Sequence, residues 1–417
     1  MQFYKDIEPW VRNNFLGYVA AYKRDLIQLS IIMLVALVAR LLALPFIPDG
    51  LLPDLKSYQL IAAEISTGVI ISNDATMPLY PLLVVLFGGT SQAHVYIGMI
   101  FGVISVVLVW AFARTFFEDR KVGLVAAWMM SIYPMAIFYG AVGLTESVFV
   151  PLILGAFLAL HKNRLVWAST LFILSILTRP TMDVFAPIVI LWNGLFIRKK
   201  GVFLAFRDLM IYGILYALIM SPWWYHNLKK YDHFVRLNQS FGVVFYSGNN
   251  PLNTSGGGIK GIDFDFKNVD GFQDRISSAE KAHLLRDAAI KYIRQEPKRF
   301  FEMALVKFFR FWRLTPYAPL VKQSSPALIT TLSLLPIIFF AFVTLITRRE
   351  MFKYFTPILG FVVYLTLIHM ITLASIRYRY PLEPLLIVIA APSITIVWNL
   401  ILGKGMPGRV LKKTMIL

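Results

Sequence analysis

The chain of 417 residues is apolar and basic: 58% of its residues are hydrophobic, only 15% are charged, and the mean hydropathy is +0.65. This composition excludes an ordinary soluble protein and predicts a polytopic membrane protein. The basic residues behind the net charge of +18 are spread over loops and membrane edges, which favours membrane lipid headgroups as partners and argues against nucleic acid. The absence of cysteine excludes disulfides, thiol catalysis and thiolate metal sites.

Apolar runs of roughly membrane length recur along the chain, because a hydrocarbon core about 30 Å thick needs about 20 helical residues. The fold class predicted is an all-α integral membrane bundle of about ten transmembrane helices. They are placed at 28–47, 93–114, 122–140, 146–160, 165–178, 183–197, 205–222, 327–346, 354–374 and 382–402. The sequence thus divides into an N-terminal transmembrane catalytic module (1–222), an outward-facing loop and interfacial helix region (223–326) and C-terminal transmembrane helices (327–417).

Basic residues predict the orientation of these helices. Arg120, Lys121, Lys162 and Arg164, together with 198–200, fall in gaps that alternate to one side of the membrane. The positive-inside rule makes that side cytoplasmic. The polar stretches 48–92 and 223–326 are therefore expected to face outward.

The first outward stretch contains Pro53-Asp54-Leu55-Lys56-Ser57-Tyr58 and then Met77-Pro78-Leu79-Tyr80-Pro81. A carboxylate at a membrane surface has water on one side and lipid-borne substrates on the other, so Asp54 is a candidate base, with Tyr58 and Tyr80 as substrate-lining residues. A structural interpretation also stands, in which Asp54 is a solvated loop acid or a helix N-cap in front of Tyr58.

A second acid, Glu146, stands where the helix predicted at 146–160 begins. It is a candidate for catalysis or for substrate positioning. It could equally be there to favour the positive end of the helix.

The stretch 223–326 begins with an aromatic group, Trp223-Trp224-Tyr225-His226, typical of a membrane interface. Trp223, His226 and Asn249 are candidate substrate-lining residues, and Lys229 is a candidate phosphate ligand. His226 and His233 flank two lysines without a carboxylate cluster, which favours interfacial histidines over a metal site. Ser277 and Glu280 have the spacing of a capping box, so a helix is expected to begin there.

After Pro297, aromatic residues alternate with basic ones as far as Arg313, including Lys307. This amphipathic pattern predicts a helix that lies in the plane of the lipid headgroups.

Near the last apolar run the chain reads Ser375-Ile376-Arg377-Tyr378-Arg379-Tyr380. Arg377 and Arg379 could hold a phosphate through paired N–H groups while Tyr378 lines a sugar or prenyl chain. The alternative is that both arginines are snorkelling anchors. Arg179, before Pro180, is a weaker phosphate candidate.

The ordered recurrence of these motifs resembles the GT-C superfamily of membrane glycosyltransferases. The match is to the bacterial branch that includes lipid A aminoarabinose transferases and protein O-mannosyltransferase-like enzymes (family 39-like). The motifs that carry the resemblance are Asp54 to Tyr58, Pro78 to Pro81, Tyr133-Pro134, Thr145-Glu146, Thr178-Arg179-Pro180, Pro222-Trp223, Gly248-Asn249-Asn250-Pro251 and Arg377-Tyr378.

The resemblance implies an inverting, multi-pass enzyme of the bacterial inner (plasma) membrane with its active site on the outer face. Its donor would be a polyprenyl-phosphate-linked sugar, hexosyl or pentosyl, and its acceptor a hydroxyl on a lipid, glycan or protein. Asp54 matches the family's first-loop acid, Glu146 its second outward acid and Arg377 its phosphate-side arginine.

The sequence departs from the family pattern at two positions. Leu55 replaces a common Glu, which weakens the case for a divalent metal, so no cofactor is expected with any strength. His226 replaces a usual Arg, which shifts phosphate binding toward Arg377, Arg379 or Lys229.

Two other functions stay open at this point. An O-antigen ligase or polymerase-like enzyme would share the lipid substrate. A polyprenyl-lipid transporter or flippase would share the many helices, although paired halves or broken helices at the midplane are not evident.

Overall fold

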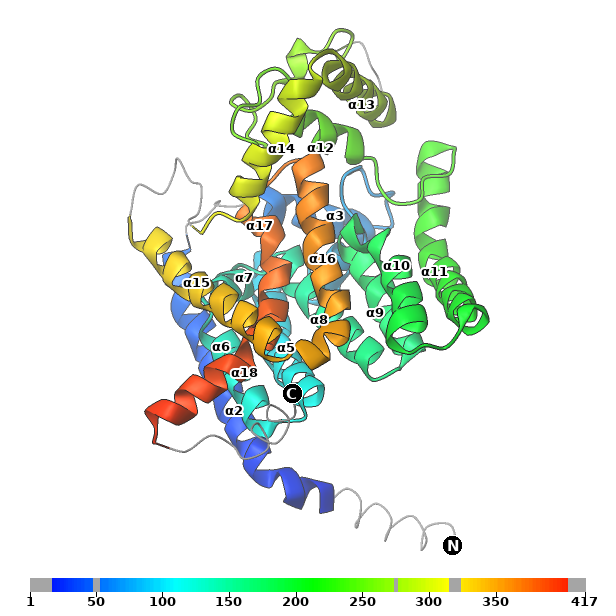
Figure 1. The fold of residues 1–417 in the computed structure, drawn as a ribbon. Coiled ribbons are helices and arrows are strands. Elements are labelled where there is room, and N and C mark those ends of the chain that lie inside the picture. Colours follow the sequence, from blue (N-terminus) through cyan, green and yellow to red (C-terminus); the bar gives the residue numbers. More distant parts are fainter. Residues whose placement is uncertain (1–16, 48–52, 274–276, 315–323, 404–417) are drawn as a thin grey trace, which may run out of the picture.

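The computed structural model describes residues 17–47, 53–273, 277–314 and 324–403, and over these residues the all-α prediction is confirmed (Figure 1). No strand is found within these ranges, where an isolated bridge between Lys260 and Phe264 is the nearest approach to one.

Six helices are long and apolar enough to cross a membrane, judged by length and composition. They lie in α2 (Gly17–Ala43), α5 (Ser91–Phe117), α11 (Val202–Tyr231), α15 (Ser324–Thr347), α16 (Phe352–Ile371) and α17 (Ile376–Arg379) continued by α18 (Glu383–Ile401). The exposed large side chains on α15, among them Leu332, Leu335 and Phe339, are typical of a lipid-facing surface.

Three shorter apolar helices complete the bundle: α8 (Thr145–His161), α9 (Leu165–Thr178) and α10 (Phe185–Trp192), which a π-helical turn extends to Ile197. They coincide with three of the predicted spans. Their lengths do not qualify them as full crossings, so the number ten stays a prediction.

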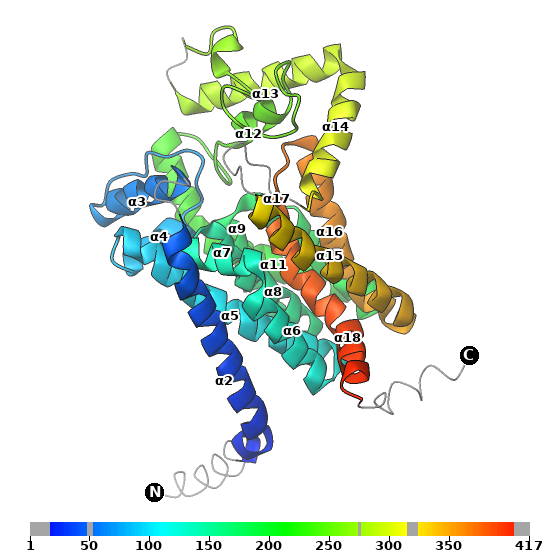
Figure 2. The same cartoon turned by 90° about the vertical axis from the view of Figure 1, so that its left-hand side faces the viewer.

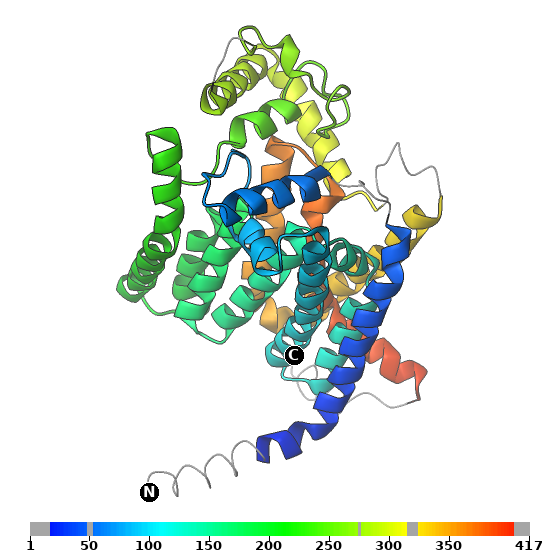
Figure 3. The ribbon, with the colours of Figure 1, turned by 180° about the vertical axis from the view of Figure 1, so that it is seen from behind.

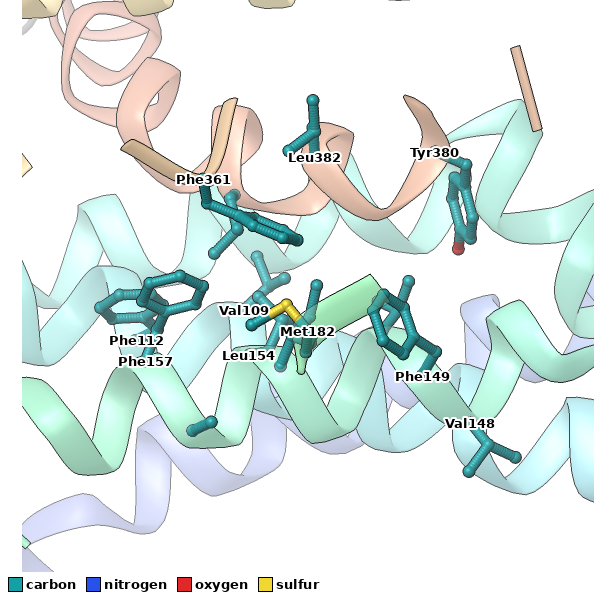
Figure 4. Packing of buried hydrophobic residues seen from close by; sticks show 14 of the residues in the cluster. Val109, Phe112, Val148, Phe149, Leu154, Phe157, Met182, Phe361, Tyr380 and Leu382 are labelled. Atoms are coloured by element: carbon teal, nitrogen blue, oxygen red, sulfur yellow. The ribbon is translucent and has the colours of Figure 1, made fainter. Parts of the chain in front are cut away.

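The centre of the bundle is formed by α5, α8 and α18, which pack against one another. Figure 4 shows Val109, Phe112, Phe149, Phe157 and Leu382 interleaved there. α18 is apolar on every side and buried for most of its length, as expected for a helix that has neighbours all around it.

The prediction of one unbroken helix at 122–140 is wrong. The chain forms α6 (Arg120–Ile132) and α7 (Pro134–Val142), which meet at an angle of 58°. Pro134 is the physical reason, because it lacks an N–H and disfavours helical geometry in the preceding residue, and Tyr133 is extended (φ −67°, ψ 121°). Counted as one bent span, the pair raises the number of crossings to seven.

Two boundaries also differ from expectation. The first polar stretch, expected as a loop at 48–92, contains α3 (Pro53–Ser66) and α4 (Leu79–Leu86). α3 buries Tyr58, Ile61 and Ala62 at helical spacing, a pattern that the sequence contains. The helix expected to end at 222 continues as α11 to Tyr231, because Pro222 is accommodated inside it.

Residues 232–273 and 277–314 form a cap region at one end of the bundle (Figures 1 and 2). It contains α12 (Phe241–Gly248), α13 (Ser278–Gln295) and α14 (Pro297–Phe311). α12 and α13 share a small core of their own that includes Phe245, Tyr246 and Leu285. The capping box at the start of α13 is confirmed, since the Ser277 hydroxyl accepts from the Glu280 N–H and the Glu280 carboxylate accepts from the Ser277 N–H.

α14 packs against α16 and extends from there into the cap region (Figure 1). Met303, Lys307 and Phe311 share the face that is turned to the protein, while Phe301 and Phe309 are exposed. Lys307 is buried although it is basic, because its position one turn before Phe311 puts it on the buried face of α14.

Seen from behind, α3 and α4 lie at the end of the bundle next to the cap region (Figure 3). The N-terminal end of α2 lies at the opposite end. A site formed by α3 would therefore lie at the end of the bundle that faces the cap region.

The orientation inferred from the basic residues can be tested with single cysteines in this cysteine-free chain. Ser72→Cys and Thr254→Cys, both at exposed positions beside the cap-side end, should react with an impermeant thiol reagent in intact cells. Lys162→Cys, exposed between α8 and α9, should react only after the membrane is opened. Reaction of Lys162→Cys in intact cells would reverse the assigned orientation.

Candidate functional site

Four charged side chains from distant parts of the chain meet at the end of the bundle beneath the cap region. Asp54 comes from the first turn of α3, Glu146 from the first turn of α8, Arg179 from the C-cap of α9, and Arg377 from α17. We refer to these four residues as the ion cluster.

Arg377 is the centre of the ion cluster. Its Nη1 donates to Asp54 Oδ2 at 2.6 Å, its Nε to Glu146 Oε1 at 2.5 Å, and its Nη2 to Glu146 Oε2 at 3.3 Å. Arg179 also donates to Glu146 Oε1. One guanidinium thus joins both predicted acids, and a second reinforces the pairing with Glu146.

The two carboxylates differ in their access to water. The Glu146 side chain is fully buried, whereas the side chain of Asp54 is 42% exposed. A buried carboxylate with two guanidinium partners suits the role of a fixed counter-charge. Only Asp54 can meet a substrate that approaches from solution.

Local backbone features direct these side chains toward each other. Gly143 has φ +69°, and a Cβ placed there would lie 1.7 Å from the His94 carbonyl oxygen, so glycine is required for this turn into α8. The turn presents Thr145 and Glu146 at the helix start. Arg179, the partner of Glu146, follows α9. Pro180 stops that helix and leaves Arg179 extended (φ −147°, ψ 126°).

Tyr58 lies beside the ion cluster and Tyr80 lies behind it. Their rings meet edge to face at a centroid distance of 4.8 Å, and Tyr58 experiences the charges of Arg377, Asp54 and Glu146. Burial raises the pKa of Tyr58 to about 12, so the phenol stays neutral. The Tyr80 hydroxyl lies 2.7 Å from His94 Nδ1 and donates to the carbonyl of Gly143, which ties α4 to the turn before Glu146.

Tyr378 belongs to a stack of side chains next to the ion cluster. Its ring is parallel to that of His369, with an interplanar angle of 3° and centroids 4.6 Å apart, and His369 in turn stacks on Phe311. The guanidinium of Arg179 lies over the Tyr378 ring, 5.4 Å from its centroid. The stack links α14 of the cap region to the ion cluster.

Arg379, the second arginine of the predicted phosphate grip, lies elsewhere. Its side chain is 2% exposed; Nε donates to Glu383 Oε1 at 2.8 Å and Nη1 to the carbonyls of Phe311 and Arg313 at 2.9 and 2.5 Å. Tyr133 donates to the other oxygen of Glu383. These contacts fasten the C-terminal end of α14 to the bundle.

The remaining predicted site residues are also apart from the ion cluster. Lys229 is exposed on the last turn of α11, above the ring of Tyr225. Trp223 stacks on His226 at 5.0 Å and donates to the carbonyl of Leu237. Asn249 is buried in the cap region, where its side-chain amide donates to the carbonyls of Phe245 and Ile371.

The described residues contain no group of three or more histidine and acidic side chains placed to hold a metal ion. The two acids of the ion cluster already accept hydrogen bonds from guanidinium groups. A cation between them would have to displace Arg377.

Sequence reasoning missed His369. His369 lies inside the apolar run of α16, where a single histidine carries no signal beyond its polarity. It also did not predict the contact of Arg236 with Asp183. Arg236 Nη2 donates to Asp183 Oδ2 at 2.5 Å, and the Tyr216 hydroxyl donates to Asp183 Oδ1 at 2.5 Å.

Comparison of the sequence with family models and with curated proteins gives no match. Comparison of the fold with solved structures does. The chain is similar to the archaeal oligosaccharyltransferase AglB from Archaeoglobus fulgidus, in complex with an inhibitory peptide and a dolichol-phosphate (TM-score 0.55, 13% identity), over 95% of this chain and 52% of that one. The apo form of the Archaeoglobus fulgidus oligosaccharyltransferase gives a TM-score of 0.52 at 13% identity, over 94% and 52% of the two chains.

ArnT from Cupriavidus metallidurans bound to undecaprenyl phosphate aligns at a TM-score of 0.45 and 12% identity, over 90% of this chain and 78% of that one. The chain spans about half the length of the oligosaccharyltransferase structures that it matches. At these identities the similarity concerns the fold. The fold of this chain is thus similar to that of the archaeal oligosaccharyltransferase structures.

Proposed function

We propose that this protein is an inverting membrane glycosyltransferase, which moves a sugar from a polyprenyl-phosphate donor to an acceptor hydroxyl at the outer face of the plasma membrane. The ion cluster is the observation that carries the proposal. It combines a solvent-accessible carboxylate, suited to a base, with two guanidinium groups, suited to a phosphate. The fold that carries the ion cluster is similar to that of a membrane glycosyltransferase, the archaeal oligosaccharyltransferase.

The reaction follows from these residue types. The acceptor oxygen attacks C1 of the sugar, the bond from C1 to the phosphate oxygen breaks, and Asp54 takes the hydroxyl proton. The polyprenyl phosphate leaves with its negative charge next to Arg377 and Arg179. A single displacement inverts the configuration at C1.

We infer that Arg377 changes partners in this reaction. Three of its five N–H groups donate to carboxylates, and a donor phosphate that competes for the Nη1 side would displace Asp54. The contact with Asp54 is the exposed one, and breaking it leaves Glu146 paired. Donor binding thus frees Asp54 to act as the base, which couples the arrival of the phosphate to catalysis.

The ligand set that we propose is narrower than the one drawn from the sequence. Tyr58 and Tyr378 line the substrate next to the ion cluster. Arg379 and Asn249 are assigned to holding the cap region, and the phosphate does not need them. A guanidinium between the two acids favours transfer without a divalent metal.

Replacing Arg377 tests the phosphate assignment. Arg377→Ala should weaken the binding of a polyprenyl phosphate by about 10- to 100-fold, the scale of a lost charge-assisted pair. Arg377→Lys should recover only part of the affinity, because a point charge lacks the guanidinium fork. Titration of the purified protein in detergent measures both.

Arg236→Lys is a matched control, since Arg236 pairs with an acid, Asp183, outside the ion cluster. Its affinity should equal that of the wild type. If both Arg377 variants bind the lipid phosphate normally, the phosphate lies elsewhere.

A further inference from the structure

Two parts of the cap region contact the same short segment of the bundle. The segment is 371–374, which runs from the last residue of α16 to the residue before the N-cap of α17. The parts are the motif Gly248-Asn249-Asn250-Pro251 and the C-terminal half of α14. The proposed chemistry uses neither of them.

The motif approaches the segment at its first two residues. Asn249 Nδ2 donates to the Ile371 carbonyl at 2.9 Å. A Cβ at Gly248 would lie 1.8 Å from the Thr372 carbonyl oxygen, so only glycine allows the backbones to come this close. Gly248 and Asn249 are therefore explained by packing on this segment.

α14 and its neighbouring loop hold the end of the segment. The Ala374 carbonyl accepts from Arg310 Nε at 2.9 Å, and the Ala374 N–H donates to the Gly256 carbonyl at 3.0 Å. Arg310 Nη1 also donates to the carbonyl and the hydroxyl of Ser255, both at 3.1 Å. Both backbone groups of Ala374 are thus bonded to the cap region.

Lys307 supports these contacts from inside α14. Its side chain is fully buried, and its Nζ donates to Asn249 Oδ1 at 3.0 Å. Burial lowers the pKa of Lys307 to about 7. A lysine is an unfavourable choice for filling apolar space, so its presence indicates a need to orient the Asn249 amide.

We propose that Arg310 and Asn249 are positioning residues for Arg377: by fixing the 371–374 segment, the cap region sets where the guanidinium stands between Asp54 and Glu146. α17 is continued by α18 at its C-terminal end, whereas its N-terminal end, which carries Arg377, is attached to the 371–374 segment. Its N-cap, Ser375, follows Ala374 directly, and the Ser375 hydroxyl accepts from the Arg377 N–H. This inference rests on the proposed function, in which Arg377 binds the donor phosphate.

A double-mutant cycle with a short-chain polyprenyl monophosphate as the probe tests the proposal on the full-length protein in detergent. Arg310→Met should weaken binding of the probe by about tenfold, although Arg310 does not touch the ligand. In an Arg377→Ala background the same change should not weaken binding further, because Arg310 acts through Arg377. Arg286→Met, an exposed change on α13, should leave the affinity unchanged. Equal weakening in both backgrounds, or none in either, overturns the proposal.

Hydrogen exchange without ligand gives an independent measurement. Arg310→Met should speed exchange of the amides at 376–379 while those of α5 and α8 stay protected. Lys307→Met, which keeps the volume and removes the bond to Asn249, should act in the same direction if Arg310→Met folds poorly.

The two measurements separate the two hypotheses. A wild-type chain that binds no lipid phosphate contradicts the proposed function. In that case hydrogen exchange still tests the positioning role. Unchanged exchange at 376–379 in a folded Arg310→Met or Lys307→Met protein overturns this role, and faster exchange supports it.

Discussion

Replacing Asp54 with Asn should lower the rate of sugar transfer by about 10²-fold or more, the usual contribution of a general base. The amide has nearly the size of the carboxylate and can still accept a hydrogen bond from Arg377 through its oxygen. It cannot take the acceptor's proton. Folded yield and lipid-phosphate affinity should stay within a few-fold of the wild type, so the comparison requires rate and affinity on the same monodisperse sample.

Glu64→Gln is the matched control for Asp54→Asn. Glu64 lies on the same helix, α3, and its carboxylate accepts from the Ser72 N–H at 2.9 Å, a bond that a glutamine oxygen can also accept. Its rate should equal that of the wild type. Normal turnover in Asp54→Asn would remove Asp54 from the mechanism, and a loss in Glu64→Gln would move the base to the other end of α3.

The second large effect is expected from Glu146→Gln. This change removes a fully buried negative charge that pairs with Arg179 and Arg377, and it leaves Asp54 as the carboxylate partner of Arg377. Breaking a buried ion pair from one side costs about 3–5 kcal/mol. The thermal midpoint should fall well below that of Asp54→Asn, and transfer should fall with it, because Arg377 loses its fixed partner.

A compensating change makes this prediction specific. Glu146→Gln combined with Arg179→Met leaves one acid, Asp54, and one arginine, Arg377, in the ion cluster. The charges balance again, so the double variant should recover part of the lost thermal midpoint. Transfer should stay low, since the phosphate then meets a single guanidinium. A Glu146→Gln protein that melts like the wild type would show that Glu146 is not the anchor of the ion cluster.

The sequence singled out all four members of the ion cluster, the two acids because charges at membrane ends are costly unless they are paired or hydrated, and the two arginines as phosphate candidates. It could not pair them. Asp54 and Arg377 are brought together by the packing of α3 and α17 on the bundle, a long-range contact that leaves no periodic signal in the chain.

The case of Arg377 and Arg379 shows the limit most clearly. Both follow the same Arg-Tyr pattern, and the sequence treats them alike. Residues two apart on a helix point in nearly opposite directions, so only one of them can reach the ion cluster. The choice depends on where α14 ends, since the carbonyls of Phe311 and Arg313 take Arg379.

Lys307 shows a second limit. Its spacing of four from Met303 and from Phe311 places it on the buried face of α14. The structure gives it an amide partner in Asn249, which no local pattern announces.

The brevity of α9 has a consequence for the membrane itself. Its 14 residues span about 21 Å, against a hydrocarbon core of about 30 Å. If α9 crosses the membrane, the bilayer beside it would have to thin, which is the response to hydrophobic mismatch. Such thinning would bring lipid headgroups toward Arg179, which directly follows the last residue of α9. A phosphate on a lipid would then reach the arginine without the lipid having to leave the bilayer.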